Sequence, residues 1–181
     1  MVEIRIHGRG GQGSVTASKL IAMASFYDGQ FSQGFPNFGV ERRGAPVTAY
    51  VRIDDKFIRL RSQIYNPDYI IIQDPSLVEA VDVFAGAKEG TIALINTEKP
   101  ASDFKAPKGV EIKTIAATKI AMQIIGKPII NTILLGAFAG LTGIIKIESV
   151  GQAITEQFTD EEIVKKNIEA AKYGFNSIKK K

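Results

Sequence analysis

The chain has 181 residues, of which 45% are hydrophobic and 23% charged, and its formal net charge is +4. This length suits one domain with a substantial core, and the composition is that of a folded globular protein and excludes intrinsic disorder. The sequence has no cysteine and a single histidine, which excludes disulfides, a cysteine nucleophile and cysteine-held iron–sulfur clusters on this chain, and argues against a histidine-rich metal site.

The hydropathy and charge patterns argue against a membrane and against nucleic acid as partners. The longest apolar run, 133–145, is interrupted by three glycines and a threonine, so it falls short of a membrane span. The N-terminus has no signal-peptide pattern, and we expect a cytoplasmic location. The basic tail 165–181 contains only Tyr173 and Phe175 as aromatic residues, which favours a solvated helix end over a nucleic-acid surface.

The first predicted elements are a strand, a glycine loop and a helix. Residues 2–6 alternate between apolar and polar side chains, as a strand does, and small side chains in the predicted helix 14–26 allow it to lie close to a sheet. The loop between them reads His7-Gly-Arg-Gly-Gly-Gln-Gly-Ser14. Backbone N–H groups at such a strand-to-helix turn can bind a phosphate, assisted by the helix dipole.

The next segment predicts a mixed sheet. Residues 30–33 are a candidate short strand, and the loop 34–46 is too long and too rich in glycine, proline and arginine for a simple connector. Residues 47–53 and 57–61 both alternate around the turn 54–56, which predicts a β-hairpin.

The rest of the chain predicts parallel strands followed by helices. Residues 69–73, 91–96 and 110–114 are the expected strands, and Asp74-Pro75 is expected to cap and begin a helix. The helices of the C-terminal third are expected at 116–125, 132–141, 148–158 and after a capping box at 159–162. The predicted fold class is α/β, a single Rossmann-like three-layer α/β/α domain over 1–181 with a mixed, mostly parallel sheet.

The glycine loop is compatible with several functions. Gly8, Gly10 and Gly13 match the dinucleotide fingerprint, but Asp28 precedes the second strand, whereas the acid that binds ribose should end it. A Walker loop would need a lysine and a hydroxyl residue where Ser14-Val15 stands. A glycine turn that only permits close packing of strand and helix is a further alternative.

Three nearby cations favour a polyanionic ligand. Lys19 lies in the first helix, and Arg42 and Arg43 stand between two glycines, where guanidinium groups can bind phosphate through two hydrogen bonds. Each of them could also be an ordinary solvated charge. No catalytic constellation is visible: we interpret His7 as a hydrogen-bonding residue at a strand end, and Asp74 as a helix cap. We therefore expect no chemistry from this chain alone.

The glycine loop and the arginine segment together resemble the gamma subunits of 2-oxoacid:ferredoxin oxidoreductases, with the pyruvate and 2-ketoisovalerate enzymes the most similar. The similarity is carried by Gly8–Gly13, by Phe38-Gly-Val-Glu-Arg-Arg-Gly-Ala-Pro-Val47, and by shorter matches at 63–65, 74–76, 96–98 and 131–132. It covers most of the chain, and the two motifs are specific as a pair.

The resemblance implies a multi-subunit enzyme that oxidatively decarboxylates a 2-oxoacid, forms an acyl-CoA and passes electrons to ferredoxin. It implies thiamine diphosphate and 4Fe-4S clusters on partner subunits of alpha, beta and delta type, and no catalytic residue, metal or cofactor bound by this chain alone. By similarity, the candidate contacts for a shared coenzyme A site are Gly10, Gly11, Gln12, Gly13, Ser14, Ser18, Lys19, Arg42 and Arg43. The alternatives are a purely structural assembly subunit or an NAD(P)-binding domain.

Overall fold

The computed structural model describes residues 1–37 and 42–179, so the part of the resemblance motif at 38–41 lies outside the described residues. The described chain forms a six-stranded sheet in the order β2-β3-β1-β4-β5-β6. The adjacent strands β1, β4, β5 and β6 run parallel to one another, and β3 runs antiparallel to both β1 and β2. The strands are β1 (Val2–Arg9), β2 (Phe31–Pro36), β3 (Pro46–Asp54), β4 (Tyr69–Ile72), β5 (Ile92–Asn96) and β6 (Glu111–Ile115).

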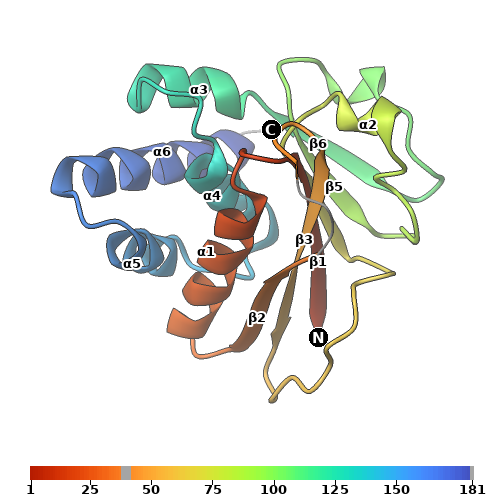
Figure 1. The fold of residues 1–181 in the computed structure, drawn as a ribbon, viewed down its shortest axis with the longest axis horizontal. Helices are drawn as coiled ribbons and strands as arrows, with labels where there is room; N and C mark the ends of the chain where they lie inside the picture. Colours follow the sequence, from red (N-terminus) through yellow and green to blue (C-terminus); the bar gives the residue numbers. More distant parts are fainter. Residues whose placement is uncertain (38–41, 180–181) are drawn as a thin grey trace.

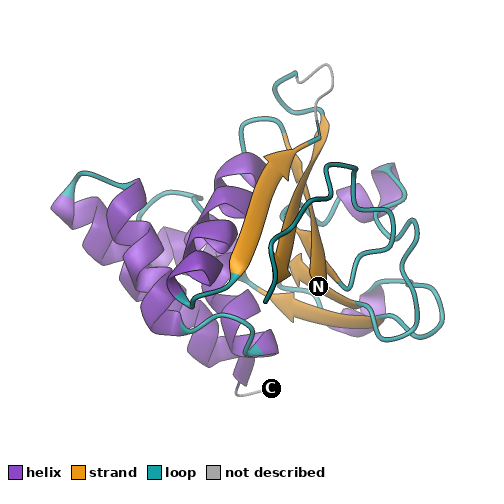
Figure 2. Cartoon of the chain, turned by 90° about the horizontal axis from the view of Figure 1, so that it is seen from below, coloured by secondary structure: helices purple, strands orange, loops and turns teal. Residues whose placement is uncertain are grey.

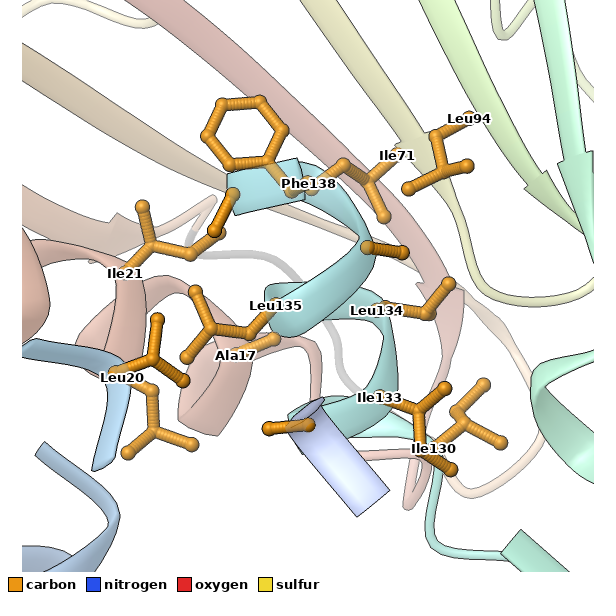
Figure 3. Close-up of a cluster of buried hydrophobic side chains, with 14 of the residues drawn as sticks. Ala17, Leu20, Ile21, Ile71, Leu94, Ile130, Ile133, Leu134, Leu135 and Phe138 are labelled. Carbon is orange, nitrogen blue, oxygen red and sulfur yellow. The ribbon is translucent and has the colours of Figure 1, made fainter. Parts of the chain in front are cut away.

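One face of the sheet is covered by helices, as Figure 1 shows. Along β1, Ile4 and Ile6 are fully buried in the main core, which they share with α1 and α4. Phe138 of α4 packs edge-on against Tyr69 of β4, with ring centroids 5.4 Å apart, and Figure 3 shows the surrounding aliphatic side chains of α1 and α4. The helices are α1 (Ser14–Tyr27), α3 (Ala117–Ile124), α4 (Asn131–Thr142), α5 (Ile147–Gln157) and α6 (Glu161–Lys179).

The opposite face is covered mostly by irregular segments, with the short helix α2 (Leu77–Ala80) and the 3-10 turn η1 (Ala101–Asp103) (Figure 2). A smaller core lies there, centred on Ile70, Ile72 and Phe84. Asp74 does accept a hydrogen bond from the Ser76 N–H at 3.0 Å, but α2 begins at Leu77 with Ser76 as its N-cap and no side-chain cap, so the expected helix start at Pro75 is wrong. The α/β fold class with a mixed sheet and a helical C-terminal third is confirmed.

The predicted hairpin between 47–53 and 57–61 is wrong. Residues 57–61 form no strand, and the antiparallel partner of β3 is β2 instead. The sequence of 57–61 alternates between apolar and charged side chains from Ile58 onward, but of these five residues Ile58 alone is buried, while Phe57 and Leu60 are exposed. Gln33 Nε2 donates a hydrogen bond to the Ile58 carbonyl at 3.0 Å, so the segment is held beside the sheet without pairing as a strand. No helix in the described residues is long and apolar enough to cross a membrane.

Candidate functional site

The candidate site lies at the edge of the sheet where the parallel strands end. After β1 the chain turns into α1 and continues to β2 on one side of the sheet, and after β4 it continues to β5 on the other side. The two connections therefore diverge between β1 and β4. In open α/β sheets such a divergence point is where ligands bind. The glycine loop 8–13 lies there (Figure 1).

The backbone of the glycine loop leaves several N–H groups open at the start of α1. Gly11 and Gly13 have φ angles of 94° and 79°, and Gly13 is the N-cap of α1, without a capping side chain. Within the described residues, the N–H groups of Gly11, Gly13, Ser14 and Val15 have no hydrogen-bond acceptor. A helix N-terminus with unpaired N–H groups and no acidic residue in its first turn favours an anion.

The glycine loop and the arginine segment are in direct contact. The Gly10 N–H donates to the Ala45 carbonyl at 2.8 Å, and the Gly44 N–H donates back to the Gly10 carbonyl at 3.0 Å. A methyl group on Gly10 would overlap the Arg42 carbonyl oxygen. Arg42 and Arg43 are exposed and form no ion pair with any described residue. The two predicted motifs therefore form one wall, with both guanidinium groups available to a ligand or to another chain.

Arg9, which was not a candidate in the sequence, connects the glycine loop and the arginine segment to the residues that follow β4. Its side chain donates to Asp74 Oδ2 at 2.9 Å, to Ser76 Oγ at 2.7 Å and to the Gly44 carbonyl at 3.1 Å. Burial by itself would raise the pKa of Asp74, but hydrogen bonds from Ser76 and the charge of Arg9 outweigh it, so the pKa lies below its usual value. Asp74 is therefore a carboxylate that is already paired within the chain.

Gln12 contributes to the shape of the loop through its side chain. Its Oε1 accepts a hydrogen bond from the Arg9 N–H at 2.8 Å, and its Nε2 lies 3.4 Å from Asp74 Oδ2. The amide is thus engaged inside the loop at both ends, and Gln12 can serve a ligand only through the conformation that it imposes.

A buried polar network holds the loop from behind. Ser14 Oγ donates to Gln73 Oε1 at 2.6 Å, and Gln73 Nε2 donates to Asn131 Oδ1 at 2.9 Å. Asn96 Nδ2 donates to the Gln73 carbonyl at 2.9 Å, and Asn96 Oδ1 accepts the Thr118 N–H. The network joins the ends of β4 and β5 to the N-terminal ends of α1, α3 and α4.

This network explains two of the three fingerprint glycines without any ligand. A methyl group on Gly8 would overlap the side chains of Gln73 and Ser14, and one on Gly13 would overlap the Asn131 amide. Together with Gly10, which faces Arg42, all three positions are glycine because other parts of the chain occupy the space of a side chain. Around Gly11 the described residues leave more room, with Arg43 Cγ 3.9 Å from the position of a Cβ.

The two candidates on α1 differ in exposure. Ser18 is fully buried, and its hydroxyl donates to the Val15 carbonyl at 2.9 Å, so we leave it out of the ligand site. Lys19 is exposed and forms no ion pair with a described residue. It lies five residues beyond the start of α1, about 7.5 Å along the helix axis, within reach of the loop for a lysine side chain.

His7, the residue before the glycine loop, is a neutral hydrogen-bond acceptor. It is buried, and its Nε2 accepts a hydrogen bond from Arg5 Nε at 3.1 Å. Burial, and then the charge of Arg5, hold the pKa of His7 at about 3. This agrees with a hydrogen-bonding role at the strand end and not with a general base.

The geometry opposes the dinucleotide interpretation. In dinucleotide-binding domains the second strand lies beside the first, and its final acid binds ribose. Here β3 lies between β1 and β2. Asp28 caps another helix instead, since its carboxylate accepts the Lys146 N–H at 2.7 Å and the Ser149 hydroxyl at 2.6 Å.

Fold and site together define a Rossmann-like α/β domain with a glycine loop whose N–H groups are open at a helix N-terminus, and with no catalytic constellation in the described residues. The family model described as pyruvate ferredoxin/flavodoxin oxidoreductase matches residues 3–177. The chain belongs to this family.

The relatives and solved structures agree with this assignment. The chain is 54% identical to the pyruvate synthase subunit PorC of Methanocaldococcus jannaschii, covering 100% of this chain and 99% of that protein. It is 53% identical to the pyruvate/ketoisovalerate oxidoreductases common subunit gamma of Thermococcus litoralis, covering 97% of this chain and 96% of that protein. The crystal structure of the pyruvate oxidoreductase subunit PORC from Thermotoga maritima has a TM-score of 0.86 and 34% identity, covering 97% of this chain and 95% of that chain.

A further match, at 24% identity and a TM-score of 0.80, shows the fold alone. It is to the 2-oxoglutarate:ferredoxin oxidoreductase from Magnetococcus marinus and covers 99% of this chain but 31% of that chain. The predicted resemblance to gamma subunits is confirmed: this chain is a gamma-type subunit of an oxidoreductase of this family.

Proposed function

We propose that this gamma subunit serves an enzyme that oxidises pyruvate or a related 2-oxoacid, and that its glycine loop and Arg42–Arg43 segment bind the phosphates of coenzyme A. In the overall reaction the oxoacid loses CO2, its acyl group joins the thiol of coenzyme A, and two electrons leave for ferredoxin. The sequence has no cysteine, so cysteine ligands of 4Fe-4S clusters belong to other chains, of delta type. Thiamine diphosphate belongs to alpha- and beta-type chains in this proposal.

The observation that carries the proposal is the contact between the two motifs at the N-terminus of α1. It brings the backbone of Arg42 and Arg43 against Gly10 and the Arg43 side chain beside Gly11, next to the open N–H groups of Gly11, Gly13 and Ser14. Coenzyme A carries a diphosphate and a 3′-phosphate, which match such a cluster of donors and cations. The structure of the fold-similar 2-oxoglutarate enzyme holds coenzyme A and succinyl-CoA, in agreement with this ligand class.

The competing function is assembly alone. It is favoured by the finding that Gly8, Gly10 and Gly13 are all explained by contacts within the chain. In that case Arg42 and Arg43 would pair with carboxylates of a partner subunit. The two functions predict different kinetics, because a ligand contact changes the affinity for coenzyme A in a complex that still assembles.

The test is Arg43→Ala in the assembled enzyme. Arg43 lies beside Gly11, where the described residues leave more room than at Gly8, Gly10 or Gly13, so losing its charge should raise the KM for coenzyme A about tenfold, or about 1.4 kcal/mol of binding. The KM for pyruvate should stay within twofold. Steady-state kinetics at varied coenzyme A concentration give both values.

Lys172→Ala is the matched control, since Lys172 is an exposed cation on α6, and it should change neither constant. Dephospho-coenzyme A, which lacks the 3′-phosphate, identifies the group that Arg43 contacts: an effect that disappears with this analogue assigns the 3′-phosphate. An unchanged KM for coenzyme A together with weaker association of the subunits would contradict coenzyme A binding by Arg43 and support the assembly function.

A further inference from the structure

The edge of the sheet formed by β2 is open in the described residues and has a hollow on each of its two faces. β2 is the terminal strand of the sheet, and in the described residues its backbone pairs only with β3. Its sequence, Phe31-Ser-Gln-Gly-Phe-Pro36, carries no charge. Proteins usually protect such an edge with charged side chains, proline, a bulge or a covering segment, because it can pair with another chain; in β2 the proline, Pro36, stands only at the last position.

The first hollow lies on the helical face of β2. It has a volume of about 280 Å³ and is lined by Ala22, Met23, Phe26, Tyr27, Ser32 and Glu156. Phe26 is 69% exposed, which is unusual for a phenylalanine at the end of a packed helix. Glu156 is already bonded to the Tyr27 hydroxyl.

The second hollow lies on the other face of the same strand. It has a volume of about 240 Å³ and is lined by Phe31, Ser32, Gln33, Phe57, Ile58 and Arg61. Phe31 and Phe57 meet edge to face with centroids 6.1 Å apart, and both are largely exposed. The backbone of 57–61 makes no main-chain hydrogen bond with any described residue, and this irregular segment follows β3 in Figure 1.

From this arrangement we infer that the β2 edge docks an extended, acidic segment of another subunit of the enzyme, as an added strand. Successive side chains of a strand point to opposite faces, so apolar residues of the added strand would fill both hollows. Main-chain hydrogen bonds to β2 would supply affinity, and the hollows would supply specificity. The inference rests on this chain being a subunit of a larger enzyme, and does not depend on coenzyme A binding.

The charge of the surface favours an acidic partner over a second copy of this chain. Arg59 and Arg61 are exposed and form no ion pair with a described residue. In the preceding turn Asp54 is paired with the N-terminal amine at 3.4 Å, and the exposed Asp55 and Lys56 carry opposite charges, so the two arginines leave the surface net positive. Two copies joined edge to edge would bring Arg59 and Arg61 near their counterparts, and like charges at an interface oppose association. A segment with carboxylates would compensate them.

Hydrogen–deuterium exchange on the isolated chain and on the assembled enzyme tests the inference without any substitution. Amides of 31–36 and 57–61 should exchange at least tenfold more slowly in the assembled enzyme. Unchanged exchange in both segments would overturn the inference. Slow exchange that depends on the concentration of the isolated chain would also overturn it, in favour of self-association.

A pair of charge reversals tests the chemistry of the partner. Arg61→Glu should weaken association of this chain with the remaining subunits at least tenfold, measured by titration calorimetry, while Lys172→Glu on α6 should leave it within twofold. If Arg61→Glu and the parent chain bind the remaining subunits with equal affinity, the partner segment is not acidic and the inference is wrong. The coenzyme A proposal is tested separately, because Arg43→Ala acts on the KM of complexes that have formed, whereas Arg61→Glu acts on formation of the complex.

Discussion

Gly136→Ala should lower the free energy of unfolding by about 3 kcal/mol, even though alanine is the better helix former. Gly136 lies in α4 where α6 crosses it, and a methyl group there would overlap the backbone carbonyl oxygen of Ala171. Because backbone atoms cannot rotate away as a side chain can, the two helices must move apart. The expected loss of stability is therefore at the upper end of the range for overpacking a core. For a chain of this size we expect the melting temperature to fall by about 10 °C.

Gly151→Ala is the matched control, and it should have the opposite sign. Gly151 lies in the interior of α5, and no atom of the described residues comes within 4 Å of the position of a Cβ there. The same substitution there gains helix propensity without a clash, which should stabilise the chain by about 0.5 to 1 kcal/mol. Thermal or denaturant unfolding of both variants compares them. If Gly136→Ala proves neutral, the close crossing of α4 and α6 is not a constraint on the fold.

The sequence predicts regular elements well wherever local chemistry marks them. The α1 helix begins at Ser14 as expected because Gly13 takes a left-handed conformation, and α6 begins where Asp160 caps it, accepting the Ile163 N–H at 3.0 Å. The predicted hairpin is wrong because 57–61 alternates in residue type alone: only Ile58 of the segment is buried, and β3 pairs with β2 instead. An alternating sequence does not by itself show whether a segment pairs as a strand.

The candidate site was only partly predictable for a related reason. Parallel strands place their following loops at one edge, so the nearness of the glycine loop and Asp74 follows from topology. The roles of Arg9 and Gln73 do not follow, because their partners Asp74 and Asn131 lie 65 and 58 residues away in the sequence. The glycine motif suggested a ligand, whereas three of its glycines are also explained by contacts within the chain, which can be seen only in the folded structure.

The stability of the chain should fall by about 2 kcal/mol between pH 7 and pH 5 because of His7 alone. Burial and the neighbouring Arg5 hold the pKa of His7 at about 3 in the folded chain, whereas an unfolded histidine titrates near 6.5. At a pH between these two pKa values, the unfolded chain binds a proton at His7 that the folded chain does not bind. The free energy of unfolding therefore rises with pH in this window and decreases as the pH falls below about 6.5. At pH 5 the decrease relative to pH 7 is about 2 kcal/mol.

Two measurements separate this effect from the titration of carboxylates. His7 is the single histidine of the chain, so one set of imidazole proton resonances reports on it, and these should not shift between pH 8 and pH 5 in the folded state. His7→Gln keeps an acceptor for Arg5 Nε without the titration. Its loss of unfolding free energy between pH 7 and pH 5, measured with urea, should be smaller than that of the parent by about 2 kcal/mol. A resonance that titrates near pH 6.5 in the folded chain would mean that the imidazole is solvated. In that case the neutral acceptor assigned to the residue before the glycine loop would be wrong.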